Sequence, residues 1–201
     1  MTNASHTIRQ ELRGILIFLG VIWAVFIVSR FFPNGLNGLG VTPRTLTGLV
    51  GIAASPFLHQ NLGHLLSNTI PLLILLVLLA GSQARSWEIV IDVALLGGLL
   101  LWICGRSGGG QVSHVGASGL VFGLIAFMIV SGFEERRIAP MIVAMIVCFL
   151  YGGTLIWNIV PHGDPTVSWD GHLTGAIAGA AVAYARTPSP EKPASETPAE
   201  P

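Results

Sequence analysis

The chain has 201 residues, of which 52% are hydrophobic and only 10% are charged. Soluble domains typically carry about 25% charged residues, so this composition excludes an ordinary water-exposed surface and favours a lipid environment. The formal net charge is zero, and nothing in the charge distribution indicates a nucleic-acid partner.

Several apolar stretches approach membrane-spanning length. In chain order they are Gly14–Phe32, Leu62–Ala80, Ile89–Cys104, Gly116–Ser131, Ile138–Val160 and Gly171–Ala185. Because a backbone in lipid must satisfy its own hydrogen bonds, each stretch is predicted to be a helix. The first follows basic residues as a signal peptide does, but no small-residue cleavage site follows it, so we interpret it as an uncleaved span. The fourth and sixth are short and rich in glycine and alanine, which favours positions inside the bundle.

The placement of basic residues predicts the orientation of these spans. If the N-terminus is cytoplasmic, the inner side carries Arg9, Arg13, Arg85, Arg136, Arg137, Arg186 and Lys192. The outer side then carries only Arg30, Arg44 and Arg106. We therefore expect a cytoplasmic N-terminus over residues 1–13, a six-span domain over residues 14–186, and a proline-rich, disordered cytoplasmic tail over residues 187–201.

The chain contains two cysteines, Cys104 and Cys148. Each lies inside an apolar run, and neither belongs to a C-x-x-C arrangement. We interpret both as small buried hydrophobic residues rather than as the halves of a disulfide.

Polar residues lie near the predicted outer ends of the second, fourth and sixth spans. A polar side chain at membrane depth costs free energy, so its presence there indicates a structural or functional role. They are His59, His64, Asn68, His114, Ser118 and His172. Counting from the cytoplasmic ends at 1.5 Å per residue places Asn68, Ser118 and His172 at a similar depth, roughly 10 Å below the outer surface of the membrane. The similar depth supports a common site.

Ser118 lies in the tetrapeptide Gly116-Ala117-Ser118-Gly119, whose glycines allow another backbone or a substrate to approach closely. A serine at this position is either a helix N-cap or a nucleophile. A nucleophilic serine needs a base, and His172 at the start of the sixth span is a candidate, although a lone histidine on an apolar helix is more often structural.

Two pairs of glycines predict how the fourth and sixth spans approach each other. They are Gly119 with Gly123 in the fourth span, and Gly175 with Gly179 in the sixth. Such faces of small residues allow close helix packing. We expect this packing to bring Ser118 and His172 close enough for a direct hydrogen bond.

His64 and Asn68 are four residues apart and therefore share one helical face. A side-chain amide, a histidine N–H and the backbone N–H of Ser118 are the kinds of donor that stabilise the oxyanion of acyl transfer. Hydrogen bonding to neighbouring helices is the alternative role for both side chains.

Four further residues are weaker candidates for the site. His59 and His114 are interpreted as structural, with His59 making a loop or cap contact. Asp164 and Asp170 lie in a predicted loop, where either is a candidate third group that orients His172. A structural role is favoured for these aspartates as well.

Three sequence blocks resemble the rhomboid family of intramembrane serine proteases. They are GVTPRTLTGLVGIAASPFLHQNLGHLLSN, which ends in the pair His64 and Asn68, HVGASGLVFG around Ser118, and SWDGHLTGAIAGA with His172. Together with the six spans they cover most of residues 40 to 185. The resemblance implies an all-α membrane protein with a six-transmembrane-helix bundle of the rhomboid type.

The resemblance also implies an endopeptidase that uses a Ser118–His172 dyad without a metal ion or a cofactor. His64, Asn68 and the Ser118 N–H would stabilise the oxyanion. The residues expected to pack around the site are Gly116, Gly119, Phe122, Gly123, Gly175 and Gly179. The implied partners are the lipid bilayer and transmembrane protein substrates, cut near the outer surface after a small residue and near helix-breaking residues. The implied location is the bacterial inner membrane, with both termini cytoplasmic.

Two departures from the family pattern matter. The first loop, from Phe32 to Ala54, is short and lacks the Trp-Arg pair of many members, which leaves open how this loop contacts lipid and gates the site. Phe122 stands where some members have tyrosine, so its ring can stack on His172 but carries no hydroxyl. Two other functions stay open: a catalytically silent rhomboid-like protein that binds membrane clients, and a small membrane transporter component.

Overall fold

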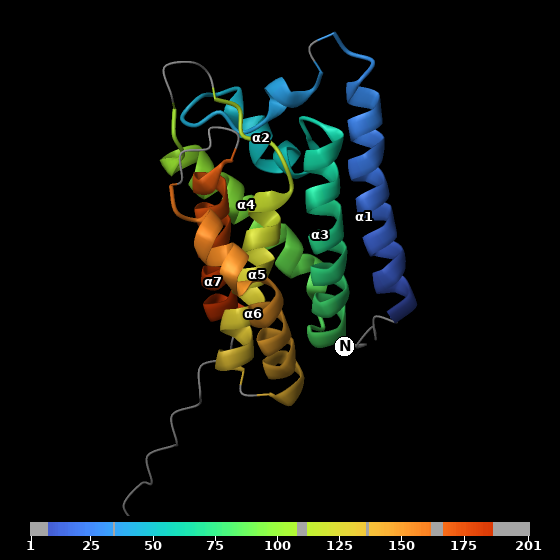
Figure 1. Ribbon diagram of the computed structural model, residues 1–201, viewed down its shortest axis with the longest axis vertical. Coiled ribbons are helices and arrows are strands. Elements are labelled where there is room, and N and C mark those ends of the chain that lie inside the picture. The colour runs from blue at the N-terminus through green and yellow to red at the C-terminus, as the bar shows by residue number, and fades with distance from the viewer. Residues whose placement is uncertain (1–7, 34, 108–111, 136, 162–166, 187–201) are drawn as a thin grey trace, which may run out of the picture.

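The computed structural model describes residues 8–33, 35–107, 112–135, 137–161 and 167–186. The long helices within these ranges are α1 (Ile8–Ser29), α3 (Leu62–Ser82), α4 (Ser86–Cys104), α5 (Ser118–Glu134), α6 (Ile138–Asn158) and α7 (Trp169–Arg186). Shorter helical segments between α1 and α3 are η1 (Asn37–Leu39), α2 (Gly48–Ala54) and η2 (Ser55–Phe57). Figure 1 shows the long helices running between the two ends of one bundle, with the start of α1 and the end of α7 toward the same end.

Each predicted span corresponds to one long helix, so the prediction of an all-α membrane bundle is confirmed. Some helix ends differ from the prediction. Helix α1 begins at Ile8 rather than Gly14, because polar residues with good helix propensity extend it beyond the apolar stretch. Helix α6 ends at Asn158 rather than Val160. Hydropathy locates an apolar stretch, whereas backbone hydrogen bonds set where a helix begins and ends.

Length and burial divide the long helices into two groups. Helices α1, α3, α4 and α6 have 19 to 22 residues and are apolar enough to cross a membrane, and no more than 33% of the best window in each is buried. Helix α5 has 17 residues and is largely buried, and half of the residues of α7 are buried as well. In Figure 1, α5 lies in the middle of the bundle. The predicted interior position of the fourth and sixth spans is therefore confirmed.

The prediction that the cysteines are buried is wrong, because Cys104 on α4 and Cys148 on α6 are both exposed. Their neighbours Ile103 and Phe149 are also exposed. Lipid tails are as apolar as the side chains themselves, so a spanning helix presents apolar residues outward as well as inward. An apolar run therefore does not identify which of its residues lie in the core.

The segment between α1 and α3, predicted to be a loop, contains α2, which packs against α4. Arg44 anchors this segment to the end of α4. Its backbone has a φ of 58°, and its guanidinium donates to the carbonyl oxygens of Ile103 and Gly105, each at 2.9 Å. The Arg44 backbone N–H donates to the Trp102 carbonyl at 3.0 Å. Arg44 thus satisfies carbonyl groups that a helix C-terminus leaves without intrahelical donors, and it fixes the outer segment on the bundle.

Candidate active site

A cavity of about 560 Å³ lies among α3, α5, α6 and the start of α7. His64 and Asn68 line it from α3, Ser118 from α5 and His172 from α7. These side chains come from helices that are far apart in the sequence. The fold brings all four predicted polar residues of the site to one cavity.

Ser118 is the first residue of α5, and the turn before it depends on Gly116. Gly116 has a φ of 117°, a backbone conformation that favours glycine. A Cβ atom there would also lie 2.6 Å from Nε2 of His64. The first intrahelical hydrogen bond of α5 runs from the Val121 N–H to the Ala117 carbonyl at 2.9 Å. The Ser118 N–H therefore belongs to the first turn, whose N–H groups have no intrahelical acceptor.

Asn68 is 5% exposed and lies beside the same turn, because its Nδ2 would be 3.6 Å from a Cβ atom at Gly116. Nδ2 donates one hydrogen to the backbone carbonyl of His64 at 3.0 Å. A side-chain amide has two N–H groups, so the second is available to another acceptor. Two of the predicted oxyanion donors thus lie next to the turn that leads into Ser118.

His172 is buried in the first turn of α7, and two contacts fix its ring. Nδ1 lies 3.2 Å from the carbonyl oxygen of Asn158 at the end of α6. Because a carbonyl only accepts hydrogen bonds, Nδ1 carries the proton and Nε2 is the basic nitrogen. The imidazole also stacks on Phe122, with ring centroids 4.1 Å apart and planes within 4°. This stacking confirms the expected contact between the two rings.

The glycine faces place α5 directly against α7. A Cβ atom at Gly175 would overlap the carbonyl group of Gly119, and one at Gly179 would overlap that of Gly123. The two backbones therefore meet with no room for a side chain between them. The predicted close approach of the fourth and sixth spans is confirmed.

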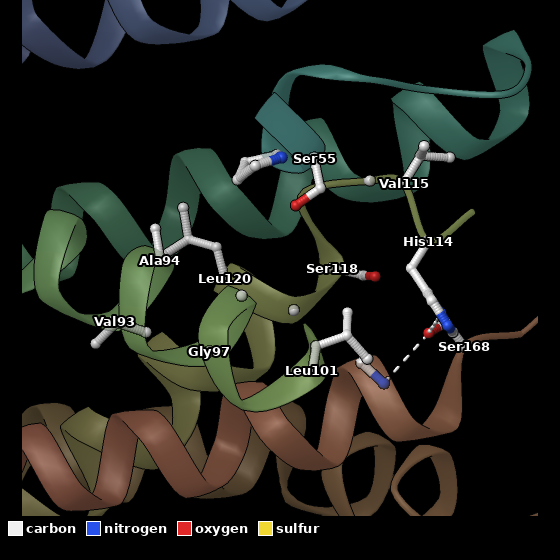
Figure 2. A pocket seen from close by; sticks show the side chains of 15 residues that line it. Ser55, Val93, Ala94, Gly97, Leu101, His114, Val115, Ser118, Leu120 and Ser168 are labelled. Atoms are coloured by element: carbon white, nitrogen blue, oxygen red, sulfur yellow. Dashed lines mark hydrogen bonds between the residues drawn. The ribbon is translucent and has the colours of Figure 1, made fainter. Parts of the chain in front are cut away.

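A second cavity, of about 40 Å³, borders Ser118 on the side of α4. Its lining includes the polar residues Ser55, His114, Ser118 and Ser168. Figure 2 shows the Ser118 hydroxyl directed toward the side of this cavity where His114 and Ser168 lie. Ser118 therefore borders two cavities, a large one shared with His172 and a small one shared with the outer loops.

His59 lies in the loop between η2 and α3, and the predicted loop or cap contact stays a prediction. It is 2% exposed, and its ring lies edge-on to His64, with centroids 5.1 Å apart. Neither ring nitrogen has a hydrogen-bond partner in the part of the chain that the structure describes. Burial and, secondarily, the neighbouring His64 lower the pKa of His59 from 6.5 to about 4. His59 is therefore neutral near pH 7 and packs against the ring of His64.

Asp170 contacts His114. Its Oδ2 lies 3.7 Å from Nε2 of His114, and Ser168 Oγ lies 2.8 Å from Nδ1 of the same imidazole. Burial lowers the pKa of His114, and the Asp170 carboxylate acts in the opposite direction. The expected structural role of His114 fits these contacts. Asp164, the other aspartate considered for His172, lies outside the described residues.

Two groups at the site were missed by reasoning from the sequence. The first is the backbone carbonyl of Asn158, which no residue type can signal. The second is Ser168, whose Oγ accepts a hydrogen bond from the Gly171 N–H at 3.2 Å and so caps the start of α7. The tetrapeptide Ser-Trp-Asp-Gly is a helix N-terminus signal and could have identified this serine.

The fold and the cavity define a multi-pass α-helical membrane protein in which Ser118, His64, Asn68 and His172 line one cavity. A family model described as the Rhomboid domain matches residues 46–189. The chain therefore belongs to the rhomboid family and is an integral membrane protein.

The chain is also similar to curated proteins of mycobacteria. Uncharacterized proteins of Mycobacterium bovis and Mycobacterium tuberculosis are each 39% identical to it over 175 residues, which cover 85% of this chain and 72% of theirs. An uncharacterized protein of Mycobacterium leprae is 38% identical over 190 residues, which cover 91% of this chain and 75% of that protein. These names assign no activity.

Proposed function

We propose that the protein is an intramembrane serine endopeptidase in which Ser118 is the nucleophile and His172 the general base. The observation that carries the proposal is that both residues line one cavity together with His64 and Asn68. A serine needs a base to become nucleophilic, and an imidazole whose Nδ1 donates to a carbonyl keeps Nε2 as its basic nitrogen. Membership of the rhomboid family supports the same chemistry.

The reaction proceeds by acyl transfer. Ser118 Oγ attacks the scissile carbonyl carbon while Nε2 of His172 takes the hydroxyl proton. The imidazolium then gives this proton to the leaving amine, and the peptide C–N bond breaks. A water molecule, deprotonated by the same nitrogen, hydrolyses the ester on Ser118. The stacked ring of Phe122 stabilises the transient imidazolium by a cation–π contact, of the order of 0.5–2 kcal/mol.

The oxyanion forms next to donors from two helices. The Ser118 N–H, the second N–H of the Asn68 amide and Nε2 of His64 surround the turn at Gly116. In an oxyanion hole, one such donor typically contributes about 3–4 kcal/mol to the transition state. In this scheme His64 acts as a donor, so its proton lies on Nε2.

The substrate is a transmembrane segment of another protein. The cavity lies between α3 and α6, and its lining includes the apolar side chains Val121, Ile125 and Leu150. In lipid, the carbonyl groups of a spanning segment are bonded within its own helix. The segment must therefore unwind locally before Ser118 can reach a carbonyl carbon. This requirement explains a preference for cleavage near helix-breaking residues. We also propose that the protein lies in the bacterial inner membrane.

Reconstitution tests the assignment. Purified protein and a model single-span substrate are combined in proteoliposomes, and the two fragments are quantified over time. The wild type should cleave, whereas Ser118→Ala and His172→Ala should each fall to background, and the double variant should lose nothing more because the pair acts as a unit. A fluorophosphonate probe should label the wild type and spare Ser118→Ala.

Three results would overturn the proposal. Wild-type cleavage by Ser118→Ala would remove this serine as the nucleophile. A wild-type protein that binds the substrate without cutting it would identify a catalytically silent client-binding protein. Proton flux through the proteoliposomes without cleavage would identify a transporter component.

A further inference from the structure

The two segments that lead into α5 and α7 meet at one end of the bundle. His114 lies four residues before Ser118, and Asp170 lies two residues before His172. Both side chains are buried, at 5% and 4% exposure. A buried carboxylate and a buried imidazole need hydrogen-bond partners to offset their loss of hydration.

Ser168 links the two side chains. Its hydroxyl oxygen lies 3.1 Å from Oδ1 of Asp170 and 2.8 Å from Nδ1 of His114. Nε2 of the same imidazole lies 3.4 Å from the carbonyl oxygen of Arg106. A hydroxyl has one proton, so the tautomer of His114 decides whether Ser168 gives it to Asp170 or to Nδ1. A continuous chain of hydrogen bonds runs from the segment before Ser118 to the first turn of α7.

Arg106 completes the environment of Asp170. Its backbone N–H donates to Oδ2 at 2.8 Å, and its Nη2 lies 3.3 Å from Oδ1. The same guanidinium lies over the ring of Trp169, 5.1 Å from the centroid. The residues that follow α4 are thereby tied to the start of α7 as well.

The backbone of His114 is fixed on its other side. Its N–H donates to the Val41 carbonyl at 2.8 Å, and the Val41 N–H donates back to the His114 carbonyl at 2.9 Å. Val41 is fully buried, and a Cβ atom at the preceding Gly40 would lie 2.5 Å from the His114 carbonyl oxygen. The segment before Ser118 is therefore held between the outer segment and the start of α7.

We propose that Asp170, acting through Ser168 and His114, is a positioning residue that sets the separation of Ser118 and His172. This inference rests on the proposed endopeptidase function. We call the three side chains of Asp170, Ser168 and His114 the outer clasp. The glycine contact between α5 and α7 fixes how close the helix axes lie, and the outer clasp fixes the two turns from which the reacting side chains project.

The outer clasp contains a serine, a histidine and an aspartate, but its serine is already engaged in holding the start of α7. The Ser168 oxygen accepts from the Gly171 N–H at 3.2 Å and contacts both Asp170 and His114. Its proposed role is therefore to join the two segments.

The test measures cleavage kinetics, probe labelling and thermal unfolding on the same preparations of full-length protein in detergent. Asp170→Asn and Ser168→Ala should lower kcat by about 10- to 100-fold, because a displacement of about 1 Å at reacting groups has effects of this order. KM should stay within about twofold, and fluorophosphonate labelling of Ser118 should slow in parallel with kcat. Ser168→Thr, which keeps the hydroxyl, should recover most of the loss seen in Ser168→Ala.

Asp92→Asn is the matched control. Asp92 on α4 pairs with Arg186 on α7, so it joins the same helix to α4 at the opposite end of the bundle. This variant should keep wild-type kcat even if its unfolding temperature falls as much as that of Asp170→Asn. Equal losses of kcat in the two aspartate variants would reduce the outer clasp to general stabilisation and overturn the proposal.

The remaining outcomes separate this inference from the proposed function. Wild-type kcat in a folded Ser168→Ala protein would refute the outer clasp alone, and this variant decides the matter if Asp170→Asn fails to fold. A wild-type protein that never cleaves would refute the endopeptidase and the outer clasp together. Loss of labelling in Ser168→Ala with labelling retained in Ser118→Ala would make Ser168 the nucleophile and overturn both proposals.

Discussion

At the residue scale, the proposed catalytic role of Asn68 depends on a single N–H group of its side-chain amide. Its amide uses one N–H on the His64 carbonyl, and the other is proposed to serve the oxyanion. Asn68→Ala should lower the turnover number about 10- to 1,000-fold, as the loss of one oxyanion donor does, with a smaller effect on KM. Steady-state cleavage kinetics measure both constants. Ser67→Ala is the control, because the Ser67 hydroxyl bonds to the same His64 carbonyl at 2.9 Å without a proposed role in catalysis. Unchanged turnover in Asn68→Ala would remove this residue from the site.

His59 should make stability depend on pH. Its pKa is about 4 in the folded protein and 6.5 ordinarily, so between these values the unfolded chain binds more protons. Stability is therefore fully present above pH 6.5 and should be lost as pH falls toward 4, by about 3 kcal/mol for this group. The unfolding midpoint of the wild type in detergent should fall between pH 7.5 and pH 4.5, the range set by these pKa values, by more than that of His59→Phe.

The comparison with His59→Phe isolates this histidine. Other buried titrating groups, His114 among them, remain in both proteins, so only the difference between the two pH profiles reports on His59. Parallel pH profiles of the two proteins would mean that the pKa of His59 is not lowered in the folded protein, because its ring has a further hydrogen-bond partner.

At the scale of helices, the contact between α5 and α7 requires glycine at the positions where the two backbones meet. A Cβ atom at Gly175 would overlap the backbone carbonyl of Gly119, and backbone on both sides leaves nothing flexible to move. Gly175→Ala should therefore force the helices apart. Overpacking typically destabilises by about 1–3 kcal/mol, whereas a shift of about 1 Å in the reacting groups lowers the rate on the order of 100-fold. Cleavage should suffer much more than folding.

Gly20→Ala provides the matched substitution. Gly20 lies within α1, and a Cβ atom there would meet nothing within 4 Å. Alanine should leave both the cleavage rate and the unfolding temperature at or above wild-type values, because glycine is the poorer helix former. If Gly175→Ala also cleaves at the wild-type rate, the glycine contact does not set the position of His172.

At the scale of the whole molecule, the orientation in the membrane remains a prediction from basic residues. In a chain whose Cys104 and Cys148 are replaced by serine, single cysteines at Gly38 and Ala84 report on opposite ends of the bundle. A side chain at Gly38 would enter open space, and Ala84 is exposed between α3 and α4. With both termini cytoplasmic, a membrane-impermeant maleimide should label the Gly38 cysteine in intact cells, and the Ala84 cysteine only after permeabilisation. The reverse pattern would invert the orientation.

Much of the site could be predicted because its residues are costly at membrane depth and stand out in an apolar chain. Ser118, His172, His64 and Asn68, all predicted as site residues, line one cavity. The stacking of Phe122 on His172 was also predictable from the resemblance to the rhomboid family. Contacts that depend on a backbone atom were not, and the His172 tautomer is set by one of them, the Asn158 carbonyl.

The sequence by itself determined the positions of the spans and the close approach of α5 to α7. Both follow from local rules: lipid requires long apolar helices, and only glycine allows two backbones to touch. Only the tertiary structure decided which faces meet lipid and which polar group partners which, as Cys104 and Asp170 demonstrate. The physical reason is that an apolar residue is equally suited to lipid and to a protein core, and that a hydrogen bond depends on distances between segments remote in sequence.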